Sequence, residues 1–187
     1  MTAAQYDKSI STGELQLNGF WEKSTHYGAA FFFMIFPLAL LVVFVAGYFE
    51  DDPPTFGWWA LAFIFVPVAL GILVFFLQKR RLKFKIVETN LSRDELKAII
   101  HEVALELQWM GNFTSARAYV AHTNPGFWSG SWGEQITILL SDNHVYVNSI
   151  CDLQQRSSPV SFGRNQRNEE TIIDHIKAAQ QNSLKIH

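Results

Sequence analysis

The chain has 187 residues, of which 49% are hydrophobic and only 17% are charged, so it can hold one soluble domain or a membrane segment with a smaller domain. Its 15 basic and 17 acidic residues nearly balance, which excludes the strong basic field of a general nucleic-acid-binding protein. The single cysteine, Cys151, excludes an internal disulfide. No Cys/His cluster has the spacing of metal ligands, and we expect neither a metal nor another cofactor.

Residues 1–27 form a polar N-terminal segment with scattered apolar side chains. The sequence GFWEK, which contains Phe20 and Trp21, is compatible with a short amphipathic piece that lies along a membrane interface. A disordered tail explains the same composition, so both interpretations stay open. In either case we expect this segment in the cytosol.

Two long stretches without any charged residue follow, at residues 29–49 and 56–77. An α-helix rises about 1.5 Å per residue, so about 20 apolar residues cross roughly 30 Å of hydrocarbon. The rest of the chain is too short to bury two such helices in a soluble core. The sequence therefore predicts a transmembrane helical hairpin over residues 28–78. Because neither stretch holds an ionisable residue, a lone hairpin of this kind is not a transporter.

The charges that flank the hairpin predict its orientation. The link at residues 50–55 has no Lys or Arg, whereas the junction at residues 79–85 reads KRRLKFK. By the positive-inside rule, both termini lie in the cytoplasm, as in a protein of the bacterial inner membrane. Each cation near an anionic leaflet gains about 1 kcal/mol, so the lipid bilayer is the first expected partner.

Residues 86–187 have the pattern of a small cytosolic domain with mixed α and β structure. A strand starts at the junction, and a helix follows that begins with a Ser92–Glu95 capping box and continues to Leu107. A closing helix is predicted over residues 168–181. Three strands between the helices are predicted over residues 116–123, 135–140 and 145–150. The order β-α-β-β-β-α predicts an antiparallel sheet with both helices on one face.

The opposite face of this sheet is a candidate surface for a protein partner. If Ile136, Ile138, Val145 and Val147 face the helices, then alternate residues project from an open and partly apolar face. A loop with two Trp residues follows the second strand, and exposed rings of this kind anchor partners or enter a membrane interface. Packing over the end of the sheet explains the loop equally well. The candidate residues are Trp128, Trp132, Thr137, Tyr146 and Asn148.

A second candidate site would bind an anion or a lipid headgroup. Polar residues gather before the last helix, and the amides of a helix start with nearby Arg can hold a phosphate group. Asn capping after a Gly turn explains the same residues without any ligand, and the spacing matches no phosphate-loop pattern. The candidate contacts are Lys79, Arg80, Arg81, Arg156, Arg164 and Asn165.

A cysteine enzyme is a third possibility that the sequence supports only through residue types. Cys151 would be the nucleophile, His144 the base and Asp142 the orienting group. No local motif accompanies these residues, and the strand between His144 and Cys151 should carry them to opposite ends. A small buried thiol is the simpler interpretation of Cys151. We therefore expect no enzymatic activity.

Several short segments resemble a known kind of domain. They are LQW at 107–109, VAHT at 120–123, SWGEQITI at 131–138, VYVNS at 145–149 and FGRNQRN at 162–168. Over this part, the chain resembles uncharacterised bacterial two-helix membrane proteins with a small C-terminal cytosolic α+β domain, and more loosely an accessory domain of rhomboid-family proteases. The spans lack the serine and the histidine of those proteases. The resemblance implies only an accessory role.

These observations lead to two functional hypotheses. The first is a membrane-anchored, non-enzymatic interaction module or accessory subunit, which engages a protein partner or forms a homo-oligomer. The alternative is a sensor whose cytosolic domain binds a small anionic ligand or a lipid headgroup. Nucleic acid is not an expected partner of either.

Overall fold

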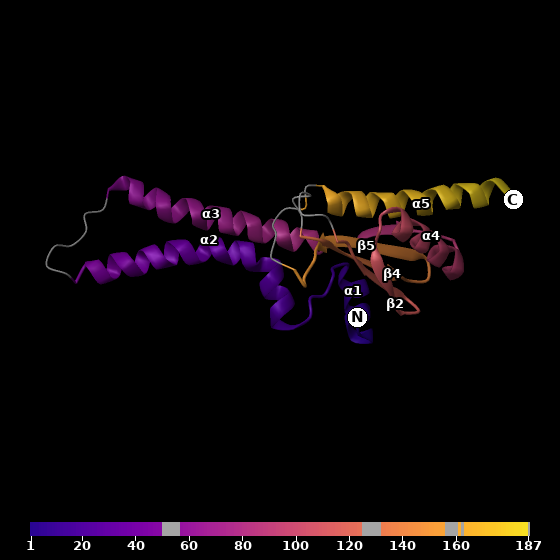
Figure 1. Ribbon diagram of the computed structural model, residues 1–187, viewed down its shortest axis with the longest axis horizontal. Coiled ribbons are helices and arrows are strands. Elements are labelled where there is room, and N and C mark those ends of the chain that lie inside the picture. The colour runs from indigo at the N-terminus through magenta and orange to yellow at the C-terminus, as the bar shows by residue number, and fades with distance from the viewer. Residues whose placement is uncertain (50–56, 125–131, 156–160, 162, 187) are drawn as a thin grey trace.

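In the computed structural model, a long helical hairpin projects from one end of an α+β domain, and both termini belong to the domain end (Figure 1). The structure describes residues 1–49, 57–124, 132–155, 161 and 163–186. The N-terminal elements and the hairpin are α1 (Ala3–Thr12), α2 (Gly19–Gly47) and α3 (Trp58–Arg81). The remaining elements are β1 (Lys85–Glu88), α4 (Arg93–Glu106), β2 (Met110–Ser115), β3 (Ala118–His122), β4 (Glu134–Leu140), β5 (His144–Cys151) and α5 (Arg164–Ile186).

The predicted hairpin is present as α2 and α3. Both helices are long and apolar enough to cross a membrane, and only 11% of the most apolar window of each is buried within the molecule. The two helices are therefore not packed inside a core of this chain. Pro37 and Pro67 both lie inside continuous helices. Helix α2 begins ten residues before the predicted stretch, because the polar residues from Gly19 onward continue the same helix.

The two hairpin helices pack closely near the domain. A Cβ atom at Gly71 would lie only 3.1 Å from Cε of Met34, so the glycine allows α3 to approach α2. Closer to the domain, the rings of Tyr27 and Phe75 stack with centroids 5.0 Å apart. His26 Nε2 lies 2.9 Å from the carbonyl oxygen of Gln78, whose side-chain amide donates to the carbonyl of His26. The hairpin is therefore fixed at its domain end.

The sheet is antiparallel, as predicted, but it has five strands in the order β1-β5-β4-β3-β2. Strand β2 was not predicted, and the element order after the hairpin is β-α-β-β-β-β-α rather than β-α-β-β-β-α. This strand reads MGNFTS and lacks apolar alternation, because it lies at the edge of the sheet with most of its side chains exposed. Its pairing with β3 is interrupted by an irregularity between Phe113 and Ser115.

Helices α4 and α5 cover one face of the sheet, as expected. The capping box at α4 is confirmed, since Ser92 N donates to Glu95 Oε2 at 2.7 Å and Glu95 N donates to Ser92 Oγ. Helix α5 starts four residues earlier than predicted and continues to Ile186. The core between the helices and the sheet includes Ile100, Val103, Ile136, Ile138, Val145, Val147, Ile172 and Ile176.

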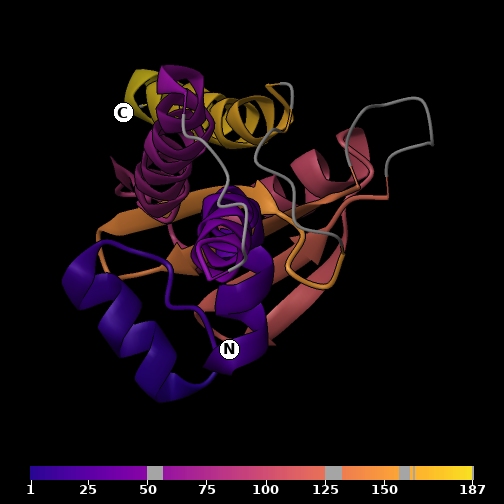
Figure 2. The same ribbon diagram turned by 90° about the vertical axis from the view of Figure 1, so that its left-hand side faces the viewer.

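The opposite face of the sheet is not open, which corrects the sequence analysis. The N-terminal segment covers it, so that α1 and α5 lie on opposite sides of the sheet (Figure 2). Tyr6 donates a hydrogen bond of 2.7 Å to the carbonyl of Leu140. A second core fills the space between this segment and the sheet. Its buried members are Leu15, Leu82, Phe84, Ala118, Leu139, Ile150 and Leu153.

Three predicted partner-surface residues therefore have a different environment. Thr137 is fully buried beside the N-terminal segment, and Asn148 is fully buried against the end of α3. Tyr146 is half-buried with its ring against Phe84. The alternation that placed these side chains opposite the helices was correct. The face is apolar because the N-terminal segment and the residues after α3 pack on it.

We expect replacement of Leu15 by Ala to lower the free energy of unfolding by about 2–4 kcal/mol, because this side chain is only 4% exposed and its loss leaves a cavity. The same change at Leu105, which is 69% exposed on α4, is the matched control and should cost under about 0.5 kcal/mol. Urea unfolding in detergent, followed by circular dichroism, measures both. Equal effects would show that the N-terminal segment is detached in solution.

Candidate functional site

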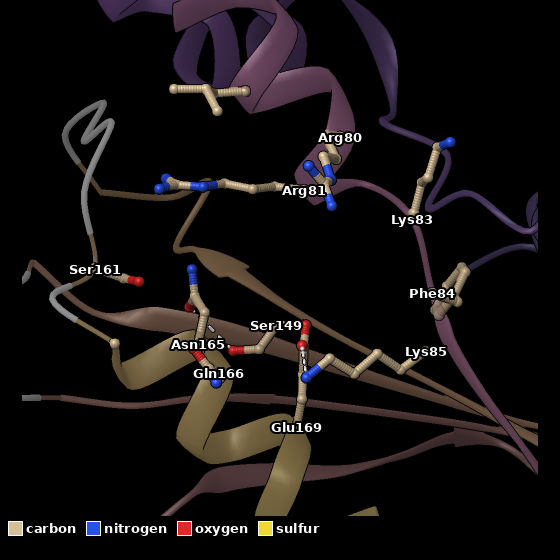
Figure 3. Close-up of a pocket in the computed structure, with 12 residues that line it drawn as sticks. Arg80, Arg81, Lys83, Phe84, Lys85, Ser149, Ser161, Asn165, Gln166 and Glu169 are labelled. Carbon is tan, nitrogen blue, oxygen red and sulfur yellow. Dashed lines mark hydrogen bonds and ion pairs between the residues drawn. The ribbon is translucent and has the colours of Figure 1, made fainter.

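A cavity of about 640 Å³ lies where the hairpin joins the domain. Its walls come from the end of α3, the start of β1, β5 and the first turns of α5 (Figure 3). We call it the junction cavity. Its lining residues are Leu77, Arg80, Arg81, Lys83, Phe84, Lys85, Ser149, Ser161, Gly163, Asn165, Gln166 and Glu169.

The junction cavity has a strong excess of positive charge. Its lining includes four cationic side chains, from Arg80, Arg81, Lys83 and Lys85, and one carboxylate, from Glu169. Lys85 Nζ lies 3.1 Å from Glu169 Oε2, so the negative charge of this carboxylate is balanced by Lys85. In the described part of the chain, no carboxylate forms an ion pair with Arg80 or Lys83. An anion in the cavity would supply the missing negative charge.

The start of α5 adds hydrogen-bond donors and a favourable dipole. Gly163 has a φ of 81°, a left-handed conformation that glycine adopts without strain, and the helix begins at the next residue. Figure 3 shows Asn165 on this first turn, with its side chain directed toward the two arginines at the end of α3. Gln166 also lines the cavity. Backbone amides and the positive end of the helix dipole both favour an anion at this position.

Glu169 organises the floor of the cavity. Its side chain is only 12% exposed and accepts a hydrogen bond of 2.9 Å from Ser149 N, while Ser149 Oγ bonds to Asn165 Oδ1 at 3.1 Å. Burial raises the pKa of Glu169, against the opposing effects of the Ser149 amide and the Lys85 ammonium. The carboxylate therefore positions Lys85 and the strand, and it also weakens the positive field of the cavity.

The structure brings together three of the six predicted anion contacts. Arg80 and Arg81 from the end of α3 meet Asn165 from the start of α5. Lys79 is exposed and does not line the cavity. Arg164 belongs elsewhere, because its Nε atom pairs with buried Glu134 at 3.0 Å.

The sixth predicted contact, Arg156, lies outside the described residues. Glu169 was not among the predicted site residues. Its position four residues after Asn165, one helical turn along the same face, was the available signal.

Exposed aromatic side chains lie near the same end of the domain. Trp132 immediately precedes Gly133 and β4, whose first residue pairs with Cys151 at the end of β5 nearest the hairpin. Its side chain is half exposed. Phe20 and Trp21, on the first turn of α2, are also largely exposed. Trp128 lies outside the described residues.

A separate polar network, which the sequence analysis did not predict, lies at the ends of β3 and β5. His122 Nδ1 is 3.1 Å from Asp152 Oδ2. The hydrogen bond to Asp152 raises the pKa of His122, although burial opposes this effect. Burial raises the pKa of Asp152, but hydrogen bonds from His122 and from the Gln154 amide outweigh it and leave this pKa below its usual value.

The residues of the cysteine-enzyme hypothesis are not brought together. His144 and Cys151 are the first and last residues of β5. A strand rises about 3.3 Å per residue, so this distance is roughly 23 Å. Asp142 forms an ion pair of 3.1 Å with Arg93. These side chains do not form a nucleophile–base pair.

The search for similar proteins gave no assignment. No protein-family model, no curated protein and no solved structure matches this chain.

The His122–Asp152 pair should make stability depend on pH. A raised His pKa contributes stability that is complete below the unfolded value of about 6.5 and is lost as pH rises through the folded pKa. The lowered Asp pKa contributes stability above about pH 3.9. We therefore expect His122→Gln to lower the melting temperature more at about pH 5.5 than at about pH 8.5.

His101, which is exposed on α4, provides the control. His101→Gln should have the same small effect at both pH values. A His122→Gln effect that is also independent of pH would contradict the role of the ion pair.

Proposed function

We propose that this protein is a membrane-anchored, non-enzymatic binding module, and that its junction cavity recognises a phosphate-bearing anion. The observation that carries this proposal is the combination of four cationic side chains with one paired carboxylate in a cavity of about 640 Å³ at the start of a helix. Phosphate groups favour Arg and Lys side chains and helix N-termini. The cavity thus supports the hypothesis of an anion sensor.

The hairpin supplies the membrane anchor in this proposal. Its exposed side chains are mostly apolar, and exposure of such a surface to water is unfavourable. The basic residues lie at the domain end of α3, so the positive-inside rule places the domain and both termini in the cytoplasm, at the bacterial inner membrane. The junction cavity would then lie at the level of the lipid headgroups.

A protein-binding or accessory role is the second candidate. The strand β2 is at the edge of the sheet, and Trp132 is exposed, so both can contact another protein or a second copy. The covered face of the sheet no longer contributes to this hypothesis. An absence of anion binding in the measurements below would favour this candidate.

We expect millimolar glycerol phosphate to raise the melting temperature of the full-length protein in neutral detergent. Arg80→Gln should weaken binding about tenfold, because it removes a cation that no described carboxylate neutralises. Glu169→Gln should strengthen glycerol phosphate binding several-fold, because it removes the only carboxylate among the described lining residues, while the new amide oxygen still accepts from Ser149 N.

Lys79→Gln is the matched control, since it removes the same charge one residue away but outside the cavity. The affinity of this variant for glycerol phosphate should stay within about twofold of the affinity of the native protein. Equal losses in Lys79→Gln and Arg80→Gln would reduce the site to general surface charge. No stabilisation of the native protein by any phosphate compound would refute the proposal.

The orientation has a separate test by cysteine labelling in a Cys151→Ser background. Tyr48→Cys, at the far end of α2, should react with a membrane-impermeant maleimide in intact cells, whereas Asn182→Cys, exposed on α5, should react only after lysis. The reverse pattern would place the domain outside the cell. Labelling of both sites in intact cells would contradict membrane insertion.

A further inference from the structure

The junction cavity has an apolar wall beside its cationic one. Leu77 lines the cavity and lies one helical turn before Arg80 and Arg81, so the three side chains share a face of α3. Phe84 lies on the β1 side of the same cavity. A small soluble anion gains nothing from these apolar groups, whereas an amphiphile uses both walls.

The apolar wall continues along the hairpin. Leu70 and Leu73 precede Leu77 by seven and four residues, which places all three on one face of α3. All three side chains are exposed. They form a row that leads away from the junction cavity along the apolar part of α3. A hydrocarbon chain attached to a group in the cavity can lie along this row.

The order of residues on α3 matches the order of groups in a phospholipid. The apolar part of the helix ends at Leu77, and the basic residues begin two positions later at Lys79. In a bilayer, the phosphate groups lie just outside the hydrocarbon. A lipid phosphate of the adjacent leaflet would therefore reach the cavity without leaving its own depth in the membrane.

From these observations we infer that the junction cavity holds the headgroup of one anionic phospholipid from the adjacent leaflet, with its acyl chain along Leu70, Leu73 and Leu77. This inference rests on the proposed function, because it names the source of the anion. It differs from general attraction between basic residues and an acidic membrane. A defined site binds one lipid molecule. Its affinity depends on the basic side chains that line the cavity and not on a basic side chain next to it.

The experiment measures lipid binding by the full-length protein. The protein in neutral detergent is titrated with phosphatidylglycerol or phosphatidylcholine and the complexes are counted by native mass spectrometry. We expect one bound phosphatidylglycerol molecule, and an affinity for phosphatidylcholine that is at least about tenfold lower. Arg80→Gln, and separately Arg81→Gln, should lower phosphatidylglycerol affinity about tenfold. Lys79→Gln should stay within about twofold, because Lys79 does not line the cavity.

Leu77→Ala separates the lipid from a soluble anion. It should weaken phosphatidylglycerol binding about threefold to tenfold and leave glycerol phosphate binding unchanged, because only the lipid contacts the apolar wall. Glycerol phosphate binding without specific lipid binding would overturn this inference and leave the proposed function intact. If neither glycerol phosphate nor phosphatidylglycerol binds, both this inference and the proposed function are overturned. Equal losses in Lys79→Gln and Arg80→Gln would show general attraction and would also overturn the inference.

Discussion

The arrangement of the molecule depends on how the end of α3 is held against the sheet. The last carbonyl groups of a helix have no partners within the helix. Here Asn148 Nδ2, on the fully buried side chain of a β5 residue, donates to the carbonyls of Arg81 and Lys83 at 2.8 and 3.1 Å. Glu14 pairs with Lys83 as an antiparallel bridge. Because these bonds fix α3 on the sheet, they also fix the arginines opposite α5.

The N-terminal segment has a structural role at the same joint. Leu15 N donates to the carbonyl of Leu82 at 2.7 Å, and Phe84 N donates to the carbonyl of Gly13 at 2.9 Å. These bonds continue the sheet-like pairing from the chain before the hairpin to the chain after it. The buried core beneath this segment then occupies the second face of the sheet. Both faces of the sheet are consequently covered within the described part of the chain, and only its edges are left open.

The sequence was most informative where one local interaction dominates. The length of the two uncharged stretches located the hairpin, and the Ser92–Glu95 capping box located the start of α4. Strand β2 was missed because a polar edge strand is stabilised by its pairing with β3, which no local pattern reveals. Arg80 and Asn165 were both proposed as anion contacts, but only the fold places them together and turns Arg164 toward Glu134. Long-range pairing decides these positions.

The junction cavity belongs to neither part of the chain alone. Residues 86–187 contain 8 basic and 11 acidic residues, so the domain by itself has an acidic balance. All four cations of the cavity precede residue 86, whereas its helix start, hydroxyl groups and carboxylate come from β5, α5 and the residues before α5. The hairpin end thus provides the charge and the domain provides the shape. The proposed anion recognition at this position therefore requires that the hairpin and the domain remain joined in the geometry that Asn148 imposes.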